Sequence, residues 1–375
     1  MEEKDLDNYE AFARIVVIGV GGAGNNAVNR MIDDNISSVE FYVANTDQQA
    51  LSRSKARNRI ILGEQCTGGL GAGGNPEVGR RAAEESIDKI RSIVEGANLV
   101  FIAAGMGGGT GTGAAPIIAQ AAKEAGALTV AIVTRPFTFE GKKRIANSVE
   151  GLNNIKDAFD AIIIVSNDKL LMVSGTAPLP QAFAESDGVL AQSVKTVTDL
   201  ILCPSYINLD FADVKNTLKD SGISLIGFGM GSGPHRSQEA ANNAINSPLL
   251  EASINGARRA ICAVTCGREV SLYEAQETVN RIIEAAGSNV DIKFGVAINE
   301  ELTDQILVSV IASDFTEEFD FTHVPTYENT MPRDNFSLEE PDSEETPNSN
   351  GEEAPAEEEN EKESFLPNFL KGKDL

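Results

Sequence analysis

Hydrophobic and polar positions follow two different periods along the first half of the chain. From Ala13 to about Ile201, short apolar runs typical of buried strands are separated by longer stretches with apolar residues at helical spacing. The expected strands are Ile15–Val20, Phe41–Asn45, Leu99–Ala104, Thr129–Thr134 and Ala161–Ser166. The expected helices are Asn26–Met31, Glu77–Val94, Ala115–Ala125 and Lys142–Ala158. Because strands and helices alternate, the pattern predicts an α/β domain whose parallel sheet is covered on both faces.

Two further patterns follow this alternation. A stripe of apolar residues at helical spacing predicts a long helix that bridges to a second domain. Its members are Val189, Val194, Val197 and Ile201. From about Pro204 to Phe315 strand-like and helical patterns are mixed, which predicts an α+β domain. We expect its last two strands, Lys293–Ile298 and Gln305–Ala312, to pair as a hairpin.

The composition changes abruptly after Phe315. The segment 317–363 holds 17 acidic residues against only Arg333 and Lys362, and few apolar residues. Such a segment cannot bury enough apolar surface to fold, so we expect a disordered, self-repelling linker. The last dozen residues become apolar and basic again.

Overall charge and residue usage exclude several classes of protein. The chain has 375 residues and a net charge of −25, which argues against a nucleic-acid binder because such proteins need a basic face. Its apolar runs are far shorter than a membrane span, and the acidic N-terminus does not resemble a secretory signal. Four cysteines without framework spacing and only two histidines make a Cys/His metal cluster improbable.

A first cluster of glycines, Gly19–Asn26, lies directly after an expected strand and opens a helix. Glycine lets backbone amides approach phosphate oxygens, and the helix N-terminus favours an anion. The spacing Gly19-x-Gly21-x-x-Gly24, with Asp47 after the next strand, also satisfies the dinucleotide fingerprint. Taken alone, this turn predicts an NAD-dependent oxidoreductase with a Rossmann fold.

A second cluster, Gly105–Gly113, changes that interpretation. It contains six glycines and two threonines between a strand and a helix, and we expect the hydroxyls of Thr110 and Thr112 to add donors for an anion. Two such turns on one parallel sheet suit a triphosphate better than a nicotinamide cofactor. Neither turn is followed by the lysine of a P-loop, so the chain is not a P-loop NTPase.

These residues resemble the tubulin/FtsZ superfamily of GTPases, on its bacterial cell-division branch. Gly107–Gly113 matches the signature GGGTGTG in full, and the resemblance runs from about Ile15 to Phe315 and resumes in the last ten residues. Further matching blocks are Asn45–Asp47, Gly69–Gly73, Asn75–Glu77, Thr134–Phe137, Phe139–Arg144, Asn167–Lys169 and Asn208–Val214. The resemblance implies six parts: an arm (1–12), a Rossmann-like GTPase domain (13–182), a central core helix (183–204), an α+β domain (205–316), the acidic linker (317–363) and a partner-binding peptide (364–375).

The resemblance also implies which residues hold GTP or GDP. The phosphates and part of the nucleoside would lie against Gly21, Gly22, Ala23, Gly24, Asn25, Asn26, Gly107, Gly108, Gly109, Thr110 and Gly111. Glu140 and Arg144 would contact the ribose and phosphates, and Phe183 would stack on the base. Asn26, Asn167 and Asp187 would recognise the guanine edge, whose N–H donors need amide or carboxylate acceptors.

The glycine turns offer no group to position the attacking water. Asp210 and Asp213, three residues apart at the expected start of a helix, project on one face and are the best candidates, with Asn208 supporting their loop. Carboxylates beside a γ-phosphate require an intervening cation, so Mg²⁺ is implied through the phosphates, with no direct protein ligand. By resemblance, this pair reaches the GTP of the neighbouring subunit, so self-assembly activates hydrolysis and head-to-tail contacts build filaments. The resemblance places those filaments in the cytoplasm, in the cytokinetic ring at the mid-cell division site.

The C-terminal peptide is similar to the peptide through which this family binds division adaptors and regulators. The residues concerned are Phe365, Leu366, Pro367, Phe369, Leu370 and Lys371. No membrane-inserting helix is evident, so attachment to a membrane would be indirect.

The chain departs from the family pattern at four positions. These are Gly68, Ser166, Gly188 and Cys266. None of them removes a proposed phosphate or carboxylate group, but they bear on catalytic rate and filament curvature. Two alternatives stay open: the oxidoreductase, and a scaffold that polymerises but hydrolyses GTP poorly, against which Asp210 and Asp213 argue.

Overall fold

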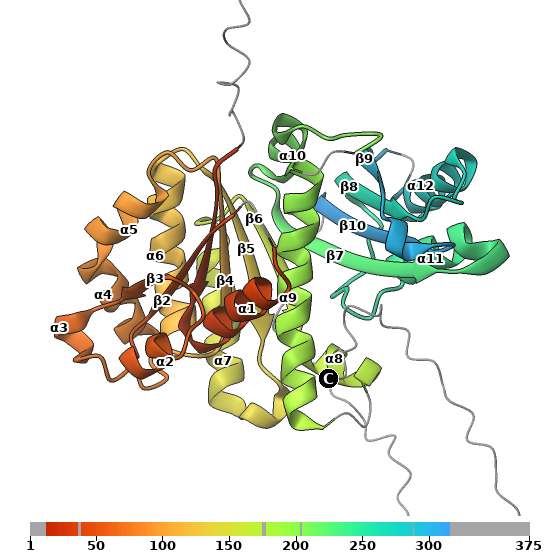
Figure 1. Cartoon of the computed structure of the whole chain (residues 1–375). Coiled ribbons are helices and arrows are strands. Elements are labelled where there is room, and N and C mark those ends of the chain that lie inside the picture. The colour runs from red at the N-terminus through yellow and green to blue at the C-terminus, as the bar shows by residue number, and fades with distance from the viewer. Residues whose placement is uncertain (1–12, 37–38, 175–177, 203–204, 288, 316–375) are drawn as a thin grey trace, which may run out of the picture.

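The computed structural model describes residues 13–36, 39–174, 178–202, 205–287 and 289–315. The expected N-terminal arm, acidic linker and C-terminal peptide lie outside these ranges. Ten strands form one continuous sheet in the order β3-β2-β1-β4-β5-β6-β7-β10-β8-β9. The first six strands belong to an α/β half and the last four to a mixed half, and helix α9 runs between them (Figure 1).

The α/β half is a parallel sheet with helices on both faces, as the alternating pattern predicts. Its strands are β1 (Ile15–Val20), β2 (Glu40–Asn45), β3 (Asn58–Ile61), β4 (Leu99–Gly105), β5 (Leu128–Arg135) and β6 (Ala161–Ser166). Its helices are α1 (Gly21–Asp33), α2 (Gln48–Ser52), α3 (Glu64–Thr67), α4 (Pro76–Glu85), α5 (Ile87–Val94), α6 (Thr110–Glu124), α7 (Lys142–Ile155) and α8 (Asn167–Ser174). All pairings among these six strands are parallel.

The central strands separate two hydrophobic cores. In β4, Leu99 and Phe101 point into one core with α1 and α9, whereas Val100 and Ile102 point into the other with α4, α5 and α6. A strand that is buried on both faces needs apolar residues at consecutive positions, which explains the unbroken apolar run that we identified in the sequence.

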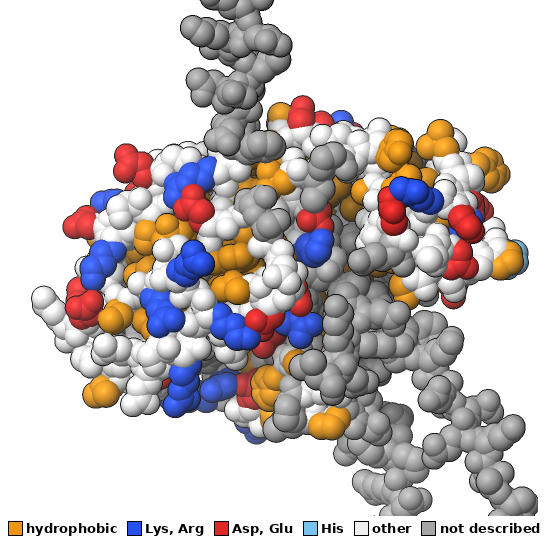
Figure 2. Space-filling view, in the orientation of Figure 1, with side chains coloured by type: hydrophobic (Ala, Val, Ile, Leu, Met, Phe, Trp, Pro, Cys, Tyr) orange, Lys and Arg blue, Asp and Glu red, His pale blue; other side chains and the backbone are white. Residues whose placement is uncertain are grey.

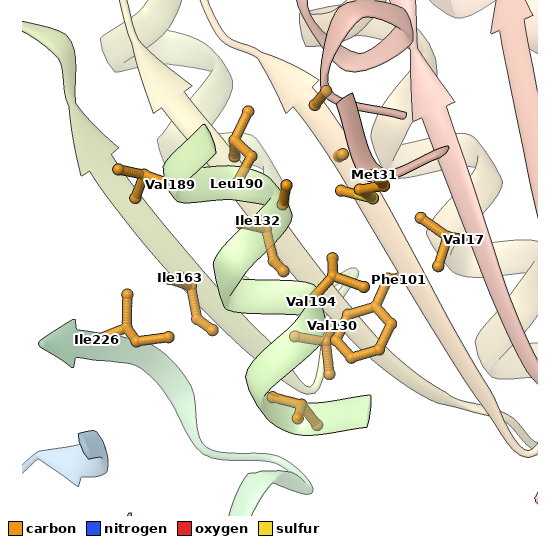
Figure 3. Close-up of a cluster of buried hydrophobic side chains, with 14 of the residues drawn as sticks. Val17, Met31, Phe101, Val130, Ile132, Ile163, Val189, Leu190, Val194 and Ile226 are labelled. Carbon is orange, nitrogen blue, oxygen red and sulfur yellow. The ribbon is translucent and has the colours of Figure 1, made fainter. Parts of the chain in front are cut away.

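Helix α9 (Leu179–Leu202) covers the region that we expected to form the long central helix. Its Val189, Leu190 and Val194 pack against Val130, Ile132 and Ile163 of the parallel sheet, and the same core continues to Ile226 of the second half (Figure 3). The apolar stripe therefore joins the two halves of the molecule. This shared burial holds the relative position of the two halves.

The second half is built on four strands and three helices. These are β7 (Gly222–Gly231), β8 (Ala257–Cys266), β9 (Asp291–Ile298), β10 (Ile306–Phe315), α10 (Phe211–Leu218), α11 (Arg236–Ile245) and α12 (Leu272–Ala286). The start of β7 pairs in parallel with β6, and β7 then pairs antiparallel with β10. Strand β7 therefore joins the parallel part and the mixed part into one continuous sheet.

Our expectation that the last two strands form a hairpin is wrong. Strand β10 is hydrogen-bonded to β7 on one side and to β8 on the other, while β9 pairs in parallel with β8. The connection through α12 brings β9 to the outer edge of β8, so β8 lies between the two strands that follow each other in the chain.

The helix expected over Glu77–Val94 is also divided. Ser86 leaves helical geometry between α4 and α5, and its buried hydroxyl accepts a hydrogen bond from the amide of Gly63 at 3.0 Å. Gly63 lies directly before α3, so this contact joins segments that are far apart in the chain. The helical periodicity of the sequence carries no information about such a contact. At the start of α4, the Asn75 side chain accepts from the amide of Glu77 at 3.0 Å as an N-cap.

Candidate functional site

The turn between β1 and α1 depends on close backbone packing. Gly21 has a φ of +72°, a conformation that favours glycine. A Cβ on Gly19 would lie 2.3 Å from the carbonyl oxygen of Gly24, and a Cβ on Gly24 would lie 2.2 Å from that of Ala103. The first glycine cluster therefore lets the start of α1 lie directly against β1 and β4.

The turn between β4 and α6 lies next to the first turn. Gly107 has a φ of +97°, and a Cβ on Gly111 would lie 2.6 Å from the carbonyl oxygen of Gly105. The two turns touch, because a Cβ on Gly21 would lie 3.0 Å from the amide nitrogen of Gly111. The N-termini of two helices thus converge, and both carry free amides and the positive end of a helix dipole. This arrangement suits an anion with several phosphate groups.

Two glycines of these turns face open space. A Cβ on Gly22 or Gly108 would meet no atom within 4 Å. The turns therefore have a packed side, which fixes the backbone, and an open side, where a ligand has room to approach.

Buried polar side chains stabilise the turns from behind. With its amide oriented to match its neighbours, Asn25 donates to the carbonyl oxygens of Gly19 and Gly21, both at 2.9 Å, and accepts from Asn45 at 3.3 Å. Asn25 is only 3% exposed. In this structure its side chain holds the backbone of the first turn.

The two threonine hydroxyls are engaged within the protein. The Thr110 and Thr46 hydroxyls are 2.7 Å apart, and the Thr112 hydroxyl accepts from the amide of Gly107 at 2.9 Å. Both threonines are nearly inaccessible to solvent. These bonds shape the turns. Because the Thr112 hydroxyl accepts from Gly107, its own proton is not used by this bond, and the expectation that both hydroxyls add anion donors stays a prediction.

Aromatic side chains gather beside the turns. Phe183 of α9 is 41% exposed and meets Phe137 edge-on, with ring centroids 5.1 Å apart. Phe137 also stacks on Phe139 at 5.0 Å, and its amide donates to the carboxylate of Glu140 at 2.9 Å. Glu140 forms an ion pair with the exposed guanidinium of Arg144. The loop after β5 thus presents an aromatic surface next to a cation.

Polar side chains that could bind the edge of a nucleotide base lie on α1, α8 and α9. Helices α1 and α8 both pack against α9. Asn26 is exposed on α1. Asn167, at the start of α8, is buried and accepts from the hydroxyl of Ser186 at 2.7 Å. Asp187 follows that serine on α9, so the serine bond ties the start of α8 to the part of α9 that carries Asp187.

Burial raises the pKa of the Asp187 carboxyl to about 7, although Arg30 acts in the opposite direction. A half-buried charged carboxylate without a strong ion partner costs free energy unless a hydrogen-bond donor contacts it. The N–H donors of a guanine edge would meet that requirement, and such groups are common at binding sites.

Two hydrogen bonds that the sequence did not predict join the loop after β5 to the start of α8. The amide and hydroxyl of Thr138 donate to the carboxylate of Asp168 at 2.9 and 2.6 Å. Both residues line a cleft with Arg135, Pro136 and Ser148. The two bonds fix the loop after β5 to the start of α8. Only the fold brings these residues together, because they are far apart in the chain.

The carboxylate pair begins α10. The Asp210 side chain accepts from the amide of Asp213 at 2.8 Å, and the Asp213 side chain accepts from the amide of Asp210 at 3.4 Å. This reciprocal arrangement is a capping box. Asp210 and Asn208 are exposed, and Asp213 is half-buried. The two carboxylates share one face, as their spacing predicts.

Within one chain the structure does not bring this pair to the glycine turns. Phe183 and Asp187 lie near the start of α9, whereas Asn208–Asp213 follow its end. From Phe183 to Leu202 the helix rises roughly 28 Å at 1.5 Å per residue. Helix α10 accordingly lies at the end of the molecule opposite α7 and α8 (Figure 1).

Exposed large hydrophobic side chains divide between these two ends. Leu70, which is 89% exposed, and Phe139 lie with Phe183 around the glycine turns. The others lie in the second half, near α12 and β9: Tyr206, Leu272, Tyr273, Phe294 and Ile298. Hydrophobic side chains are visible over α12 at the upper right of Figure 2.

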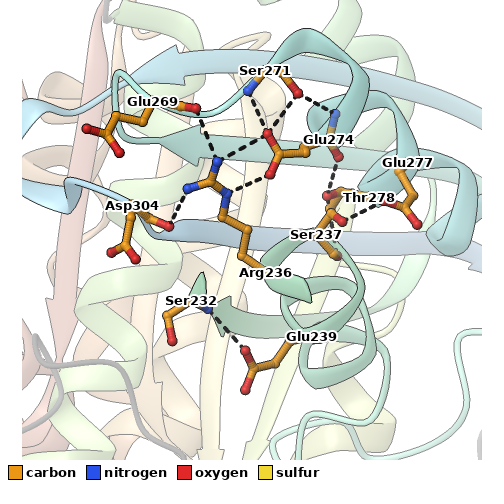
Figure 4. A network of polar contacts seen from close by, with 10 residues as sticks. All are labelled: Ser232, Arg236, Ser237, Glu239, Glu269, Ser271, Glu274, Glu277, Thr278 and Asp304. Atoms are coloured by element: carbon orange, nitrogen blue, oxygen red, sulfur yellow. Dashed lines mark hydrogen bonds and ion pairs between the residues drawn. The ribbon is translucent and has the colours of Figure 1, made fainter. Parts of the chain in front are cut away.

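The start of α12 is held by a polar network (Figure 4). Arg236 pairs with the carboxylate of Glu274 at 2.7 Å and also donates to the carbonyl oxygens of Glu269 and Asp304. Glu274 completes a capping box with Ser271. These contacts lower the pKa of Glu274 to about 2 and fix the exposed first turn of the helix, which carries Leu272 and Tyr273.

In the described part of the chain, no group of three or more His, Cys, Asp or Glu side chains is placed to hold a metal ion. Among the same residues, no helix combines the length and the apolar character that crossing a bilayer requires.

Comparisons with known proteins agree with this geometry. Residues 14–175 match the model of the Tubulin/FtsZ family, GTPase domain, and residues 222–316 match that of the FtsZ family, C-terminal domain. A solved FtsZ dimer from M. jannaschii is 40% identical, with a TM-score of 0.79 over 84% of this chain and 91% of that one. The fold is also similar to that of CetZ2 from Haloferax volcanii, solved as a protofilament with bound GTPγS, at 20% identity and a TM-score of 0.69 over 80% of this chain and 92% of that one.

The match to a GTPase family sets aside the alternative of a nicotinamide oxidoreductase. The mixed α/β fold with its two halves also matches the two-domain fold of these proteins. The chain belongs to the Tubulin/FtsZ family and is a GTPase that binds guanine nucleotides.

Proposed function

We propose that this chain polymerises head-to-tail with GTP, and that hydrolysis is completed where the carboxylate pair of one copy meets the nucleotide of the next. The observation that carries the proposal is the separation along α9, because a pair that follows the end of this helix cannot reach a nucleotide bound near its start. A second copy is then needed to complete the reaction centre.

The nucleotide would lie against the open side of the two turns. The groups that approach it are those of Gly21, Gly22, Ala23, Gly24, Asn25, Asn26, Gly107, Gly108, Gly109, Thr110 and Gly111. Glu140 and Arg144 would contact ribose and phosphate, and Phe183 would stack on the base. Asn26, Asn167 and Asp187 would recognise the guanine edge, supported by the serine bond that holds Asn167 beside α9.

The carboxylate pair would orient and activate the attacking water. Within the described residues, the capping box occupies one oxygen of each carboxylate and leaves Asp210 Oδ2 and Asp213 Oδ1 for this water. Asp213 would accept its proton as the new bond to the γ-phosphorus forms and the bond from the γ-phosphorus to the β–γ bridging oxygen breaks, with GDP as the leaving group; Asn208 would support the loop. Mg²⁺ bound through the phosphates would neutralise the charge between the carboxylates and the γ-phosphate.

The distribution of exposed apolar side chains supports the head-to-tail arrangement. A surface at the nucleotide end meeting a different surface at the α10 end makes a heterologous contact, which leaves both outer ends free and builds filaments. The dimer and the protofilament among the solved relatives agree with such self-association.

The biological role we propose is the cytokinetic ring at the mid-cell division site of a bacterium, with cytoplasmic filaments attached through adaptors. The adaptors would bind the C-terminal peptide, whose residues Phe365, Leu366, Pro367, Phe369, Leu370 and Lys371 lie outside the described residues. The match to the FtsZ C-terminal domain supports this role over that of a poorly hydrolysing scaffold.

A complementation experiment tests the shared reaction centre. Asp213→Ala removes a carboxylate but keeps the nucleotide site, whereas Gly108→Glu places a negative charge on the open side of a turn where phosphates would lie. Each variant alone should hydrolyse GTP very slowly. A mixture should recover activity, because the GTP on the first variant meets the intact carboxylates of the second.

Two results would contradict this proposal. One is a mixture no more active than the sum of its parts although light scattering shows that both chains assemble together. The other is a specific activity of the unmodified chain that stays constant down to the lowest protein concentrations, because a shared centre requires activity to rise above a threshold concentration.

A further inference from the structure

A run of cations interrupts the acidic character of this protein. Between Asp47 and Glu64 there is no acidic residue, yet the chain carries four exposed cations at alternate positions. These are Arg53, Lys55, Arg57 and Arg59, which we call the basic strip. The strip lies before and within β3, the edge strand of the sheet. Lys and Arg side chains are prominent on this face of the parallel half (Figure 2).

The strip is held in a fixed shape. Alternate with the cations are Ser54, Ala56 and Ile60, which are buried. The Ser54 hydroxyl and the Lys55 amide both bond to the side-chain oxygen of Asn29 on α1 at 2.8 Å. These contacts point all four charges to the solvent side, so an incoming ligand does not need to order the loop.

Most of this positive charge is not neutralised locally. Lys55 pairs with Asp33 at 2.6 Å. The Arg59 guanidinium donates to the carbonyl oxygens of Ser54 at 2.6 Å and Ala56 at 3.0 Å, which leaves its charge in place. For Arg53 and Arg57 the structure records no carboxylate partner among the residues it describes. With Asp33 counted, the strip has a net charge of +3.

We propose that the strip is the docking site for the acidic segment 339–363 of the same chain. This segment holds 12 acidic residues against the single cation Lys362. A nucleic acid or an anionic bilayer would also be attracted to the strip, but each would have to approach the acidic segment of the same chain as well, and this segment repels both. The covalently attached acidic segment is always present near the strip.

The length of chain between the two is sufficient. Strand β10, which ends at Phe315, is seven strand positions from β3, or roughly 34 Å at about 4.8 Å per strand. From Phe315 to the middle of the acidic segment there are about 36 residues, for which a coil has an r.m.s. span of roughly 30–36 Å. The segment therefore reaches the strip without being fully extended.

Attachment within one chain makes weak contacts effective. Each exposed ion pair stabilises little and is screened by salt. A tethered partner, however, is present at an effective concentration in the millimolar range, so several weak contacts maintain a substantial docked population. Docking would also cover the outer edge of β3, beside which none of the described strands lies and which could otherwise pair with another chain.

Carbodiimide cross-linking of the full chain, followed by mass spectrometry, tests the proposal. This reagent joins amines to carboxylates, and Lys55 is the amine of the strip. We expect cross-links from Lys55 to residues of 339–363 at low ionic strength and their loss at about 0.5 M salt. The cross-link from Lys55 to Asp33 measures the reactivity of the amine in the same sample.

A pair of double variants makes the test specific. Arg53→Ser with Arg57→Ser should lower the tail cross-links of Lys55 by roughly threefold or more relative to the Asp33 cross-link, because two exposed charge contacts are lost. Lys142→Ser with Lys143→Ser removes the same charge from exposed positions on α7 and should leave them unchanged. Equal losses in both variants, no loss in the first, or absence of tail cross-links would overturn the proposal. Mixing chains of natural and heavy isotope composition adds a further condition: cross-links formed only between different chains would overturn docking within one chain.

Discussion

The two ends of the molecule present different parts of the polypeptide at the proposed reaction centre. At the glycine turns the proposed binding groups belong to the backbone, and close contacts between main-chain atoms fix their position: a Cβ on Gly24 would lie 2.2 Å from a carbonyl oxygen. At the start of α10 the proposed catalytic groups are two side chains, one exposed and one half-buried, whose structural role is to cap a short helix. The first end therefore tolerates little change of shape, whereas the second can lose its chemistry and keep its fold.

The largest effect expected from this difference is on turnover. Asp213→Ala should lower GTP hydrolysis by about 100- to 1000-fold, as the loss of a positioned charged group does in other enzymes, and should change nucleotide affinity little. Phosphate release and nucleotide binding, measured on the same preparation, separate these effects. A matched control is Asp88→Ala, which removes an exposed acid from the first turn of α5 and should keep turnover within about twofold. Normal hydrolysis by the Asp213 variant would remove the carboxylate pair from the mechanism.

The next effect concerns the open side of the turns. Gly108→Glu should weaken nucleotide binding by roughly a hundredfold, because a carboxylate would lie among the phosphate-binding amides at low effective dielectric. Gly108→Ala adds only a methyl group in open space and should change affinity by less than about threefold. Thermal unfolding without nucleotide should be similar for both variants. If the alanine variant lost affinity as strongly as the glutamate variant, the distinction between a packed and an open side would be wrong.

A smaller effect should appear as a pH dependence of nucleotide affinity, caused by Asp187 at the proposed site for the base. Burial raises the pKa of Asp187 to about 7, above the value of 3.8 for a free side chain, so the folded chain without nucleotide binds more protons than the unfolded chain between these values. Its stability from this group therefore falls as the pH rises from about 4 to 7. Guanine binding needs the charged form, so affinity should rise by about tenfold from pH 6 to pH 8.

Calorimetric titration with GDP at several pH values measures this trend. Asp187→Asn should bind more weakly and lose most of the dependence over the same range. A dependence that persists unchanged in this variant would assign the titration to another group.

The pattern of the sequence predicted the parallel half of the fold well. The unbroken apolar runs identified β1, β4, β5 and β6, and the stripe Val189–Ile201 identified the helix that joins the two halves. The sequence pattern gave wrong predictions where contacts with a distant segment of the chain determine the structure. Ser86 divides a helix because its hydroxyl reaches Gly63, and β8 takes the position beside β10 that chain order suggested for β9. Strand pairing in a mixed sheet depends on which edges remain free, and periodicity carries no such information.

The candidate site shows the same division. The glycine motifs located the two turns, and the spacing of Asp210 and Asp213 placed both carboxylates on one face. The contacts of the Thr110 and Thr112 hydroxyls with Thr46 and Gly107 were not predictable from the motif, and the expectation that these hydroxyls offer anion donors stays a prediction. The bond from Thr138 to Asp168 has no signal in the sequence, because thirty residues separate them.

The sequence by itself determined that two glycine turns follow parallel strands and that a long helix leads to a carboxylate pair, because these features depend on neighbouring residues along the chain. Only the tertiary structure decided that the carboxylate pair lies at the end of the molecule opposite α7 and α8 (Figure 1), that the turns touch, and that burial raises the pKa of Asp187 to about 7. Position, contact and burial arise from how segments far apart in the chain pack together, and they underlie our proposal that two copies of the chain complete one reaction centre.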